Sequence, residues 1–389
     1  MKLTLKARPE DFLVREIAQP VWGEKGTHAV YLLTKRNRNT VELLIAIADR
    51  LGVPFGRFSY GARKDRRALT HQFVAIAHPK RFELKDKDFT LAYVGRMDRP
   101  MGPDLIAAND FTVVVRNLEA GAAAGGLAAL DGIAAAGFAN YFDDQRFGCH
   151  DPLQGFFAEK LLKRQFNGAL KVYMTAAAFA DDAAARERKR FFFERWRDWD
   201  ACLKEAKTSF EKRAFARLRD DPKDFFGPLK DIPLHEMTLF VSAYQSFLWN
   251  EMLRRLLTDR GLGQRVYEGA VGPYCFWTPG HVFDDGQAFP SLPMPGLRPV
   301  FEYTFIKELY DGVLADNGAR QALFNKVVPR RVFFKSFPRP SRVRPEGLQA
   351  AASADDMYPS RQKLTLSFRL PRGSFATMMI KAAFSESIA

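Results

Sequence analysis

The 389-residue chain lacks most of the sequence signals that mark common protein classes. It has three cysteines, Cys149, Cys202 and Cys275, without CxxC spacing, so the sequence predicts neither a disulfide framework nor a zinc site. It contains no run of about 18 apolar residues, which argues against a membrane-spanning helix. The first residues, MKLTLKARPEDF, lack the apolar segment of a secretion signal. We therefore expect a cytoplasmic protein that does not associate with membranes.

Signatures of cofactor chemistry are also missing. The chain has no P-loop, no GxGxxG after a strand, no HExxH and no GxSxG elbow. Its six histidines are scattered without the spacing of metal ligands, and the adjacent Asp143 and Asp144 lack further ligands nearby. The sequence therefore predicts that the protein holds no metal and no cofactor.

Positive charge is abundant: the net charge is +14 and the pI is about 9.7. Such a charge favours a polyanionic partner such as nucleic acid, although a merely basic enzyme is the alternative. Residues 317–345 contain no acidic residue, and their basic residues are interleaved with three phenylalanines, a composition that suits RNA. The alternative is an exposed strand or loop with its phenyl rings packed inward. The residues of this window are Arg320, Lys326, Arg330, Arg331, Lys335, Arg339, Arg342 and Arg344, with Phe333, Phe334 and Phe337.

The periodicity of apolar residues changes along the chain. The first 150 residues mix strands and helices, the middle is helical and the end returns to strands, which predicts a discontinuous domain with an insertion. We expect strands at 11–17, 28–35, 73–77, 111–115, 364–368 and 376–381. We expect helices at 41–51, capped by Thr40, at 119–137, within 155–220 and at 238–258, and a charged loop at 58–68.

A single carboxylate lies within a cluster of cations at residues 60–72. Asp65 is flanked by Arg63, Lys64, Arg66 and Arg67. Nearby positive charge lowers the pKa of a carboxyl group, and an ionised, positioned aspartate can act as a nucleophile. The same cations, Lys64 and Arg66 among them, would attract phosphate groups. The alternative is a solvated loop in which the aspartate caps a turn.

A second cluster follows the small-residue helix. It places the amide of Asn140, the rings of Tyr141 and Phe142, and the guanidinium of Arg146 close together in sequence. Such a set can hold an unstacked base by hydrogen bonds and stacking. Alternatively, Phe142 and Phe147 are ordinary core residues and Arg146 takes part in a salt bridge.

Six short motifs, in order along the chain, resemble those of the TruD family of tRNA pseudouridine synthases. Three positions depart from the family pattern: Asn37 stands where a turn glycine is usual, Gly61-Ala62 reverses the usual Ala-Gly order, and Ala108-Asn109 replaces a usual Gly-Asn. Asparagine tolerates the left-handed region, whereas a positive φ at Ala62 would be strained. The motifs are Pro9-Glu-Asp-Phe12-x-Val14-x-Glu16, Lys35-Arg-Asn-Arg-Asn39-Thr40, Lys64-Asp65-Arg66-x-Ala68-x-Thr70-x-Gln72, Asn140-Tyr141-Phe142-x-x-Gln145-Arg146-Phe147-Gly148, Gln245-Ser-Phe-Leu-Trp-Asn250 and Phe368-x-Leu370-Pro371-x-Gly373-Ser374-Phe375-Ala376-Thr377.

The resemblance implies that the protein isomerises uridine at position 13 of tRNA to pseudouridine, with Asp65 as the nucleophile. The bond between N1 and C1′ breaks, the base rotates and C5 bonds to C1′, a reaction that needs no cofactor. Attack at C1′ and attack at C6 are both open. The target base must leave its stack, and Phe142 would then stack on it. Lys35 would border the site, and Asn140 would fix the neighbouring loop or base.

The resemblance also implies an α+β fold. A pseudouridine-synthase-like catalytic domain with a mixed β-sheet would be formed by residues 1–154 and 341–389, with a TRUD domain of α/β type inserted at 155–340. RNA would occupy the cleft between them, and we expect a monomer. The alternatives are a synthase acting on another RNA and a non-catalytic RNA-binding protein or chaperone on the same fold.

Overall fold

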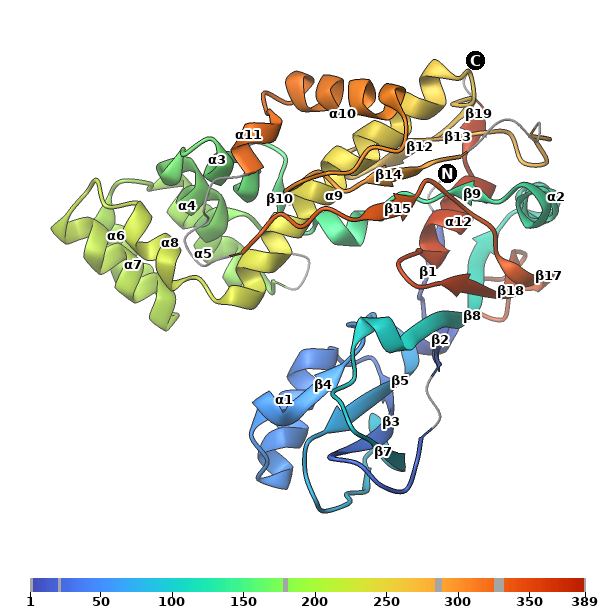
Figure 1. Ribbon diagram of the computed structural model, residues 1–389, viewed down its shortest axis with the longest axis horizontal. Helices are drawn as coiled ribbons and strands as arrows, with labels where there is room; N and C mark the ends of the chain where they lie inside the picture. The colour runs from blue at the N-terminus through green and yellow to red at the C-terminus, as the bar shows by residue number, and fades with distance from the viewer. Residues whose placement is uncertain (1–2, 20–21, 178–180, 284–288, 325–331, 388–389) are drawn as a thin grey trace. The chain divides into compact units, whose positions relative to one another are not determined.

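The computed structural model describes residues 3–19, 22–177, 181–283, 289–324 and 332–387 (Figure 1). The chain divides into two compact units. Unit 1 comprises Met1–Phe138, Pro279–Phe283 and Val343–Phe384, and unit 2 comprises Ala139–Thr278, Asp284–Arg342 and Ser385–Ala389. Unit 1 thus contains residues from both ends of the chain, and unit 2 contains most of the middle. The domain boundaries predicted near residues 154 and 340 stay a prediction.

Unit 1 is built on a ten-stranded mixed sheet with the order β17-β18-β8-β2-β5-β3-β7-β6. The pair β2–β5 is parallel, and it joins one half of the sheet, which contains the C-terminal strands, to the other half. Strand β1 adds to β8, and β4 adds to β5. The strands are β1 (Thr4–Leu5), β2 (Phe12–Ala18), β3 (His28–Arg36), β4 (Phe58–Tyr60), β5 (Leu69–Ile76), β6 (Leu84–Lys85), β7 (Phe89–Met97), β8 (Ile106–Leu118), β17 (Glu346–Ala354) and β18 (Gln362–Pro371).

Helix α1 (Thr40–Leu51) covers the half of the sheet that contains β3 and β5. The Asn39 side chain caps its start by accepting hydrogen bonds from two backbone N–H groups, and Gly52 ends it in the left-handed region at φ 64°. The helix packs Leu43, Leu44 and Ile47 into a core with apolar residues of the strands. Burial of this face, more than helix propensity, holds the helix on the sheet.

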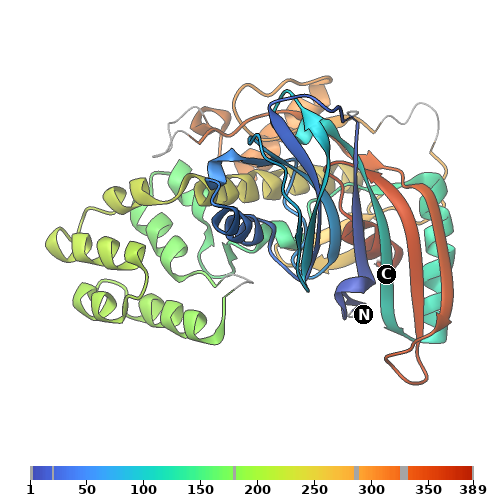
Figure 2. The same cartoon turned by 90° about the horizontal axis from the view of Figure 1, so that it is seen from below.

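Helix α2 (Ala120–Ala136) lies against β17 and β18, and helix α12 (Ala376–Ala383) packs beside it (Figure 2). Small residues allow the close approach. A Cβ atom added at Gly126 would lie 2.6 Å from the ring of Phe384, so a larger residue there would separate the helix from its neighbours.

Unit 2 is mainly helical, and its longest helix is α9 (Leu234–Asp259). Unit 2 also contains three small sheets within its described residues. Strands β12 (Arg265–Gly269), β13 (Gly272–Phe276) and β19 (Glu386–Ser387) form one sheet, β14 (Ser291–Pro293) pairs with β15 (Pro338–Pro340), and β10 (His150–Asp151) pairs with β11 (Gly155–Phe156). The other helices are α3 (Phe157–Leu162), α4 (Phe166–Thr175), α5 (Ala183–Glu194), α6 (Trp199–Glu205), α7 (Ser209–Asp220), α8 (Phe226–Asp231), α10 (Thr304–Asp316) and α11 (Gln321–Phe324). The chain passes between the units at β9 (Phe138–Ala139) and β16 (Arg342–Val343).

The predicted α+β class is confirmed, and so are most of the predicted elements. Three local predictions were wrong. Residues 376–381 form helix α12, because a short run of Ala and Met that is buried on all sides has no strand alternation and favours a helix. Asn39, not Thr40, caps α1. Residues 58–60 of the expected loop form strand β4.

Within the described ranges, no helix is both long and apolar enough to cross a membrane. The same part of the chain contains no group of three or more His, Cys, Asp or Glu side chains that could hold a metal ion.

Candidate active site

Asp65 lies in unit 1, on the loop between β4 and β5. Its side chain is 32% exposed, and its Oδ2 accepts a hydrogen bond from the Nζ of Lys6 at 2.8 Å. The Asp65 carboxylate is thus paired with an ammonium group and still open to solvent, so a substrate can reach it.

Lys6 is a residue of this site that our sequence analysis missed. It follows β1, whose pairing with β8 fixes its position, and it adopts a left-handed backbone with φ 58°. This conformation costs a non-glycine residue about 1–2 kcal/mol. Its Nζ also lies 4.2 Å from the centroid of the Phe12 ring. Lys6 belongs to none of the sequence motifs. Strand pairing brings it close to Asp65, and the local sequence does not reveal this.

The cations beside Asp65 in sequence have other surroundings. Lys64 turns inward, with its Nζ 2.6 Å from Oδ1 of Asn109 and 2.8 Å from Oε1 of Glu16. Glu16 and Asn109 are register partners on β2 and β8, so Lys64 fastens the loop to the sheet. Arg63, Arg66 and Arg67 are exposed. The substrate-binding roles of Lys64 and Arg66 stay predictions.

Lys35 lies directly beneath the loop at the end of β3. It is completely buried, and its Nζ donates a hydrogen bond to the main-chain carbonyl of Asp65 at 2.7 Å. Burial lowers the pKa of Lys35 to about 8, against the opposing effect of the Asp65 carboxylate. Lys35 therefore fixes the backbone of Asp65 and adds positive charge below it.

Hydrogen bonds from α1 and β5 hold the rest of the loop. The Lys64 N–H donates to Oγ1 of Thr40 at 3.2 Å, and Nε2 of Gln72 donates to the carbonyl of Ala62 at 3.3 Å. Thr40 and Gln72 are also bonded to each other. The loop that carries Asp65 is thus supported along its length.

Two of the departures from the family pattern have physical explanations. Asn37 adopts φ 53°, a left-handed turn that asparagine tolerates. Ala62 is not among the described residues with positive φ, so the expected strain is absent. Gly61 is required for space instead, because a Cβ atom there would lie 2.5 Å from Cγ1 of Ile106.

The second predicted cluster lies in unit 2, where Asn140 joins its loop to strand β15. Its Nδ2 donates to the carbonyl of Pro340 at 3.0 Å, and its N–H donates to the carbonyl of Ser341 at 2.9 Å. Arg339 donates in turn to the carbonyl of Asn140 at 2.7 Å and to its Oδ1 at 3.0 Å. Asn140 is 2% exposed, so fixing this loop accounts for its contacts.

Phe142 lies between guanidinium groups. The Cζ of Arg339 is 3.9 Å from its ring centroid, and that of Arg146 is 5.3 Å away. Trp249 meets the ring edge-on at 5.6 Å. The ring of Phe142 is 5% exposed, and its stacking on a base stays a prediction, as does a substrate contact by Arg146.

Arg339 differs from the surface cation that we expected. It is 6% exposed, and burial lowers its pKa to about 9, with a smaller contribution from nearby Arg146. Burial lowers the pKa of Arg146 as well. Arg339 is buried and holds the Asn140–Phe142 loop, while a contact of the window 317–345 with RNA stays a prediction. Lys326, Arg330 and Arg331 of the same window lie outside the described residues.

The Gln245–Asn250 motif on α9 supports this cluster. Oδ1 of Asn250 accepts a hydrogen bond from the N–H of Phe142 at 2.8 Å, and Nδ2 donates to the carbonyl of the same residue at 2.9 Å. Trp249 donates from Nε1 to the carbonyl of Leu292 at 3.1 Å. The motif therefore positions the backbone of Phe142.

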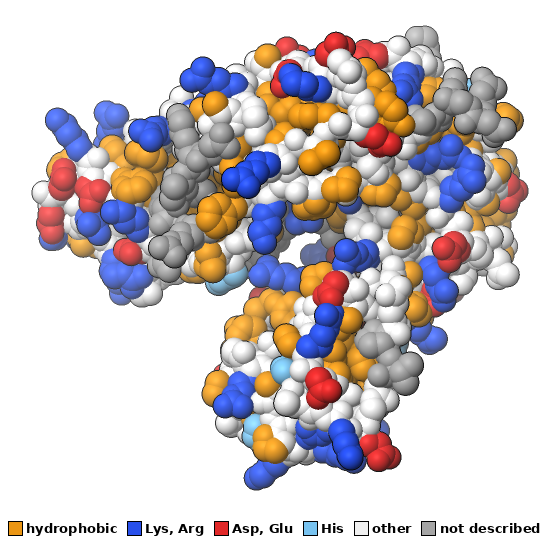
Figure 3. Space-filling model, in the orientation of Figure 1, with side chains coloured by type: hydrophobic (Ala, Val, Ile, Leu, Met, Phe, Trp, Pro, Cys, Tyr) orange, Lys and Arg blue, Asp and Glu red, His pale blue; other side chains and the backbone are white. Residues whose placement is uncertain are grey.

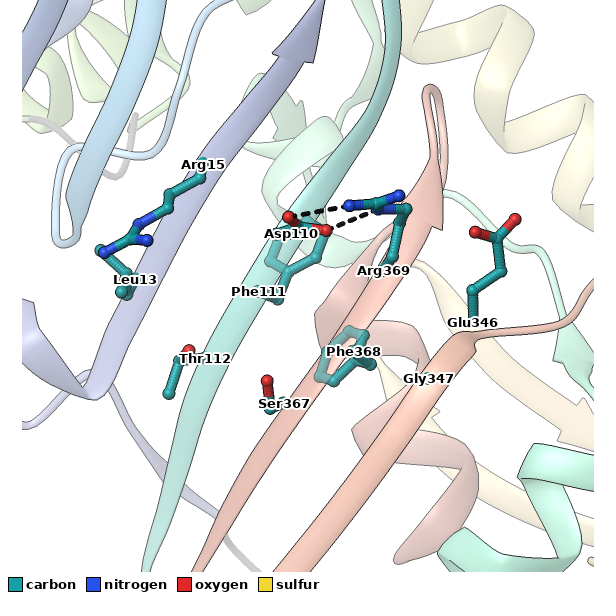
Figure 4. A pocket seen from close by; sticks show the side chains of 10 residues that line it. All are labelled: Leu13, Arg15, Asp110, Phe111, Thr112, Glu346, Gly347, Ser367, Phe368 and Arg369. Atoms are coloured by element: carbon teal, nitrogen blue, oxygen red, sulfur yellow. Dashed lines mark hydrogen bonds and ion pairs between the residues drawn. The ribbon is translucent and has the colours of Figure 1, made fainter.

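A groove of about 520 Å³ opens elsewhere on the sheet of unit 1 (Figure 4). Arg369 is paired with Asp110 within it, with Arg15 and Glu346 on either side. Register places Arg15, Asp110 and Arg369 in one row, whereas neighbouring Glu16 and Asn109 point to the opposite face toward Lys64. The groove is therefore separate from the Asp65 loop.

The structure brings Lys35, Lys64 and Asp65 together in unit 1. It brings Asn140, Phe142 and Arg146 together in unit 2, and Arg66 is exposed on the loop of Asp65. The first group presents a partly exposed carboxylate on a braced loop, and the second presents a loop whose aromatic ring has two guanidinium groups nearby.

Comparison with known proteins gives the family. The sequence profile of the family described as tRNA pseudouridine synthase D (TruD) matches residues 1–274 and 277–382. The chain belongs to the TruD family. It is 29% identical over 399 residues to tRNA pseudouridine synthase D of Leptospira interrogans, with 98% of this chain and 96% of the relative covered. It is 26% identical over 407 residues to that of Aquifex aeolicus, with both chains covered completely.

A solved TruD structure is similar over the same extent. The crystal structure of a TruD chain from Methanosarcina mazei matches with a TM-score of 0.69 and 26% identity, covering 98% of this chain and 93% of that one. The TruD resemblance inferred from six motifs is confirmed.

Proposed function

We propose that this protein isomerises a uridine of tRNA to pseudouridine, with Asp65 as the nucleophile. Membership of the TruD family supports the reaction class and the substrate. The observation that carries the proposal is Asp65 itself, a partly exposed carboxylate paired with Lys6 on a loop that Lys35 supports from below. A protein that only bound RNA would need no such group.

The chemistry requires no group beyond the chain and its RNA. The Asp65 carboxylate attacks the target nucleotide at C1′ or at C6, and both routes remain open. On either route the bond to Asp65 breaks again before the product leaves, which regenerates the carboxylate. The N1–C1′ bond breaks, a C5–C1′ bond forms, C5 loses a proton and N1 gains one. The ammonium group of Lys6 positions the carboxylate for attack through their ion pair.

The target uridine must leave its stack to meet Asp65, at a cost of a few kcal/mol. We assign to Asn140, Phe142 and Arg146 the task of receiving the base, with Phe142 as the stacking surface. Position 13 of tRNA is the site of modification that we propose, and we propose a monomer as the active form.

The test is to map pseudouridines in total RNA from cells with and without the gene, and then to complement the deletion. We expect loss at tRNA position 13 alone and restoration by the wild type but not by Asp65→Ala. Asp131→Ala, a change of an exposed aspartate on α2, is the matched control and should restore the modification. Loss at a different RNA site would favour the alternative substrate, and an unchanged map would favour a non-catalytic RNA-binding protein.

A further inference from the structure

The segment Val332–Pro340 of unit 2 exposes two phenyl rings to solvent. Phe333 and Phe337 are 54% and 53% exposed, more than any other described phenylalanine, whereas Phe334 between them is completely buried. Lys335 is exposed as well. Neither exposed ring has a ring or cation partner in the part of the chain that the structure describes.

The backbone of this segment is held firmly, so its exposure is not that of a loose loop. The Leu297 N–H donates to the carbonyl of Phe334 at 2.6 Å, and the Met294 N–H donates to that of Phe337 at 2.9 Å. Nε2 of Gln245, on α9, donates to the carbonyl of Lys335 at 3.0 Å. The two rings are therefore presented to solvent by a backbone that is fixed on both sides.

Charge alone does not locate a path for RNA, because Lys and Arg side chains are spread over the surface drawn in Figure 3. Exposed aromatic rings discriminate better, since each can stack on an unpaired base. Residues 332–340 contain no acidic residue, and Lys335 is exposed among them, which suits a polyanionic partner. Arg339, which holds the Asn140–Phe142 loop, follows Phe337 by two residues.

We propose that Phe333, Lys335 and Phe337 form a stacking platform for unpaired nucleotides of the RNA substrate. The two rings stack on bases without selecting their sequence, and Lys335 pairs with a phosphate between them. The identity of the RNA as tRNA rests on the proposed function. The platform binds RNA but takes no part in the isomerisation.

The test measures tRNA affinity and chemistry separately. For Phe333→Ala/Phe337→Ala we expect Kd for unmodified tRNA to rise by about tenfold or more. The single-turnover rate of pseudouridine formation at saturating protein should stay at the wild-type value. Phe226→Ala, which changes a phenylalanine that is 36% exposed on α8, is the matched control and should not alter Kd. Lys335→Gln should reduce the slope of the logarithm of tRNA affinity against the logarithm of salt concentration by about one, as expected when one phosphate contact is lost.

Leucine substitutions separate stacking from general apolar contact. We expect Phe333→Leu/Phe337→Leu to weaken tRNA binding as much as the alanine pair, because leucine keeps apolar area but lacks a ring face. Wild-type Kd in either pair, with folding verified by circular dichroism, would overturn the platform while leaving pseudouridine formation intact. If the wild type binds tRNA through these rings but forms no pseudouridine, the platform stands and the proposed function fails.

Discussion

The ammonium group of Lys6 lies 2.8 Å from Oδ2 of Asp65, although 59 positions separate the two residues along the chain. Only the pairing of β1 with β8 brings them together. Lys6 is therefore the residue whose change should affect Asp65 most directly without touching its loop.

We expect Lys6→Ala to slow single-turnover pseudouridine formation by about ten- to a hundredfold, because the carboxylate loses the group that positions it. Lys6→Arg should recover part of the rate by keeping the charge. Lys87→Ala, at an exposed position of the same unit, should have no effect. A wild-type rate in Lys6→Ala would show that the ion pair plays no part in catalysis.

Burial of Lys35 predicts a pH-dependent contribution to stability. Its pKa in the folded protein is about 8, below the ordinary value near 10.5 that applies to the unfolded chain. Between these values the unfolded state binds more protons, so the free energy of unfolding should rise with pH, by at most about 3 kcal/mol. Urea unfolding at pH 7.5 and 10.5 should show this rise in the wild type relative to Lys35→Met. If the free energies of unfolding of wild type and Lys35→Met differed by the same amount at both pH values, the predicted contribution of Lys35 would be refuted.

The contacts of Arg339 with Asn140 and Phe142 predict that Arg339 is a positioning residue. Arg339→Lys keeps the charge but loses the planar guanidinium, whose Nη2 donates to both oxygen atoms of Asn140 and which lies over the rings of Phe142 and Trp249. We expect it to lower kcat by about tenfold or more, nearly as much as Arg339→Met, with a smaller change in KM. Arg186→Met, at an exposed site of unit 2, is the control.

If Arg339 were only a structural residue, its variants would lose thermal stability while turnover per folded molecule stayed at the wild-type value. Measurement of kcat, KM and the melting temperature on the same samples separates the two outcomes.

Arg116 predicts a large effect on stability. Its buried guanidinium is paired with Asp11 and Asp355, both almost inaccessible to solvent. Removing one partner from a buried pair leaves uncompensated charge, so Arg116→Met should lower the free energy of unfolding by about 3–5 kcal/mol. Arg36→Met breaks a surface pair with Glu10 and should leave the free energy of unfolding almost unchanged.

The same cluster predicts how this loss depends on pH. Burial raises the pKa of Asp355, but hydrogen bonds from the Asn117 and Met357 N–H groups and from Arg116 outweigh it, so the pKa lies below its usual value. A lowered carboxyl pKa stabilises the fold above about pH 4, and this stabilisation is lost as the pH falls through the folded value. The difference between wild type and Arg116→Met should therefore shrink below pH 4. A constant difference would contradict this account.

The sequence was informative where its signals are local. Apolar periodicity predicted α9 and five strands of the sheet (β2, β3, β5, β8 and β18), and the motif around Asp65 identified its loop. The strand predicted at 376–381 was wrong because a short apolar stretch that is buried on all sides has the same sequence pattern in a strand and in a helix. Lys6 and Arg339 were missed or misplaced because their roles depend on distant strand pairing and on burial, which composition does not reveal.

The place of β18 in the sheet has a consequence for synthesis of the protein. This strand lies between β8 and β17, and its Phe368 stacks on Phe111 of β8. While the ribosome makes the chain, the edge of β8 that pairs with β18 has no partner until almost all residues have been added. Most of unit 2 emerges earlier. A chain that ends before Val343 would leave one side of β8 unpaired, the kind of edge on which proteins aggregate. Premature termination late in the message should thus yield an insoluble product, not a shortened enzyme.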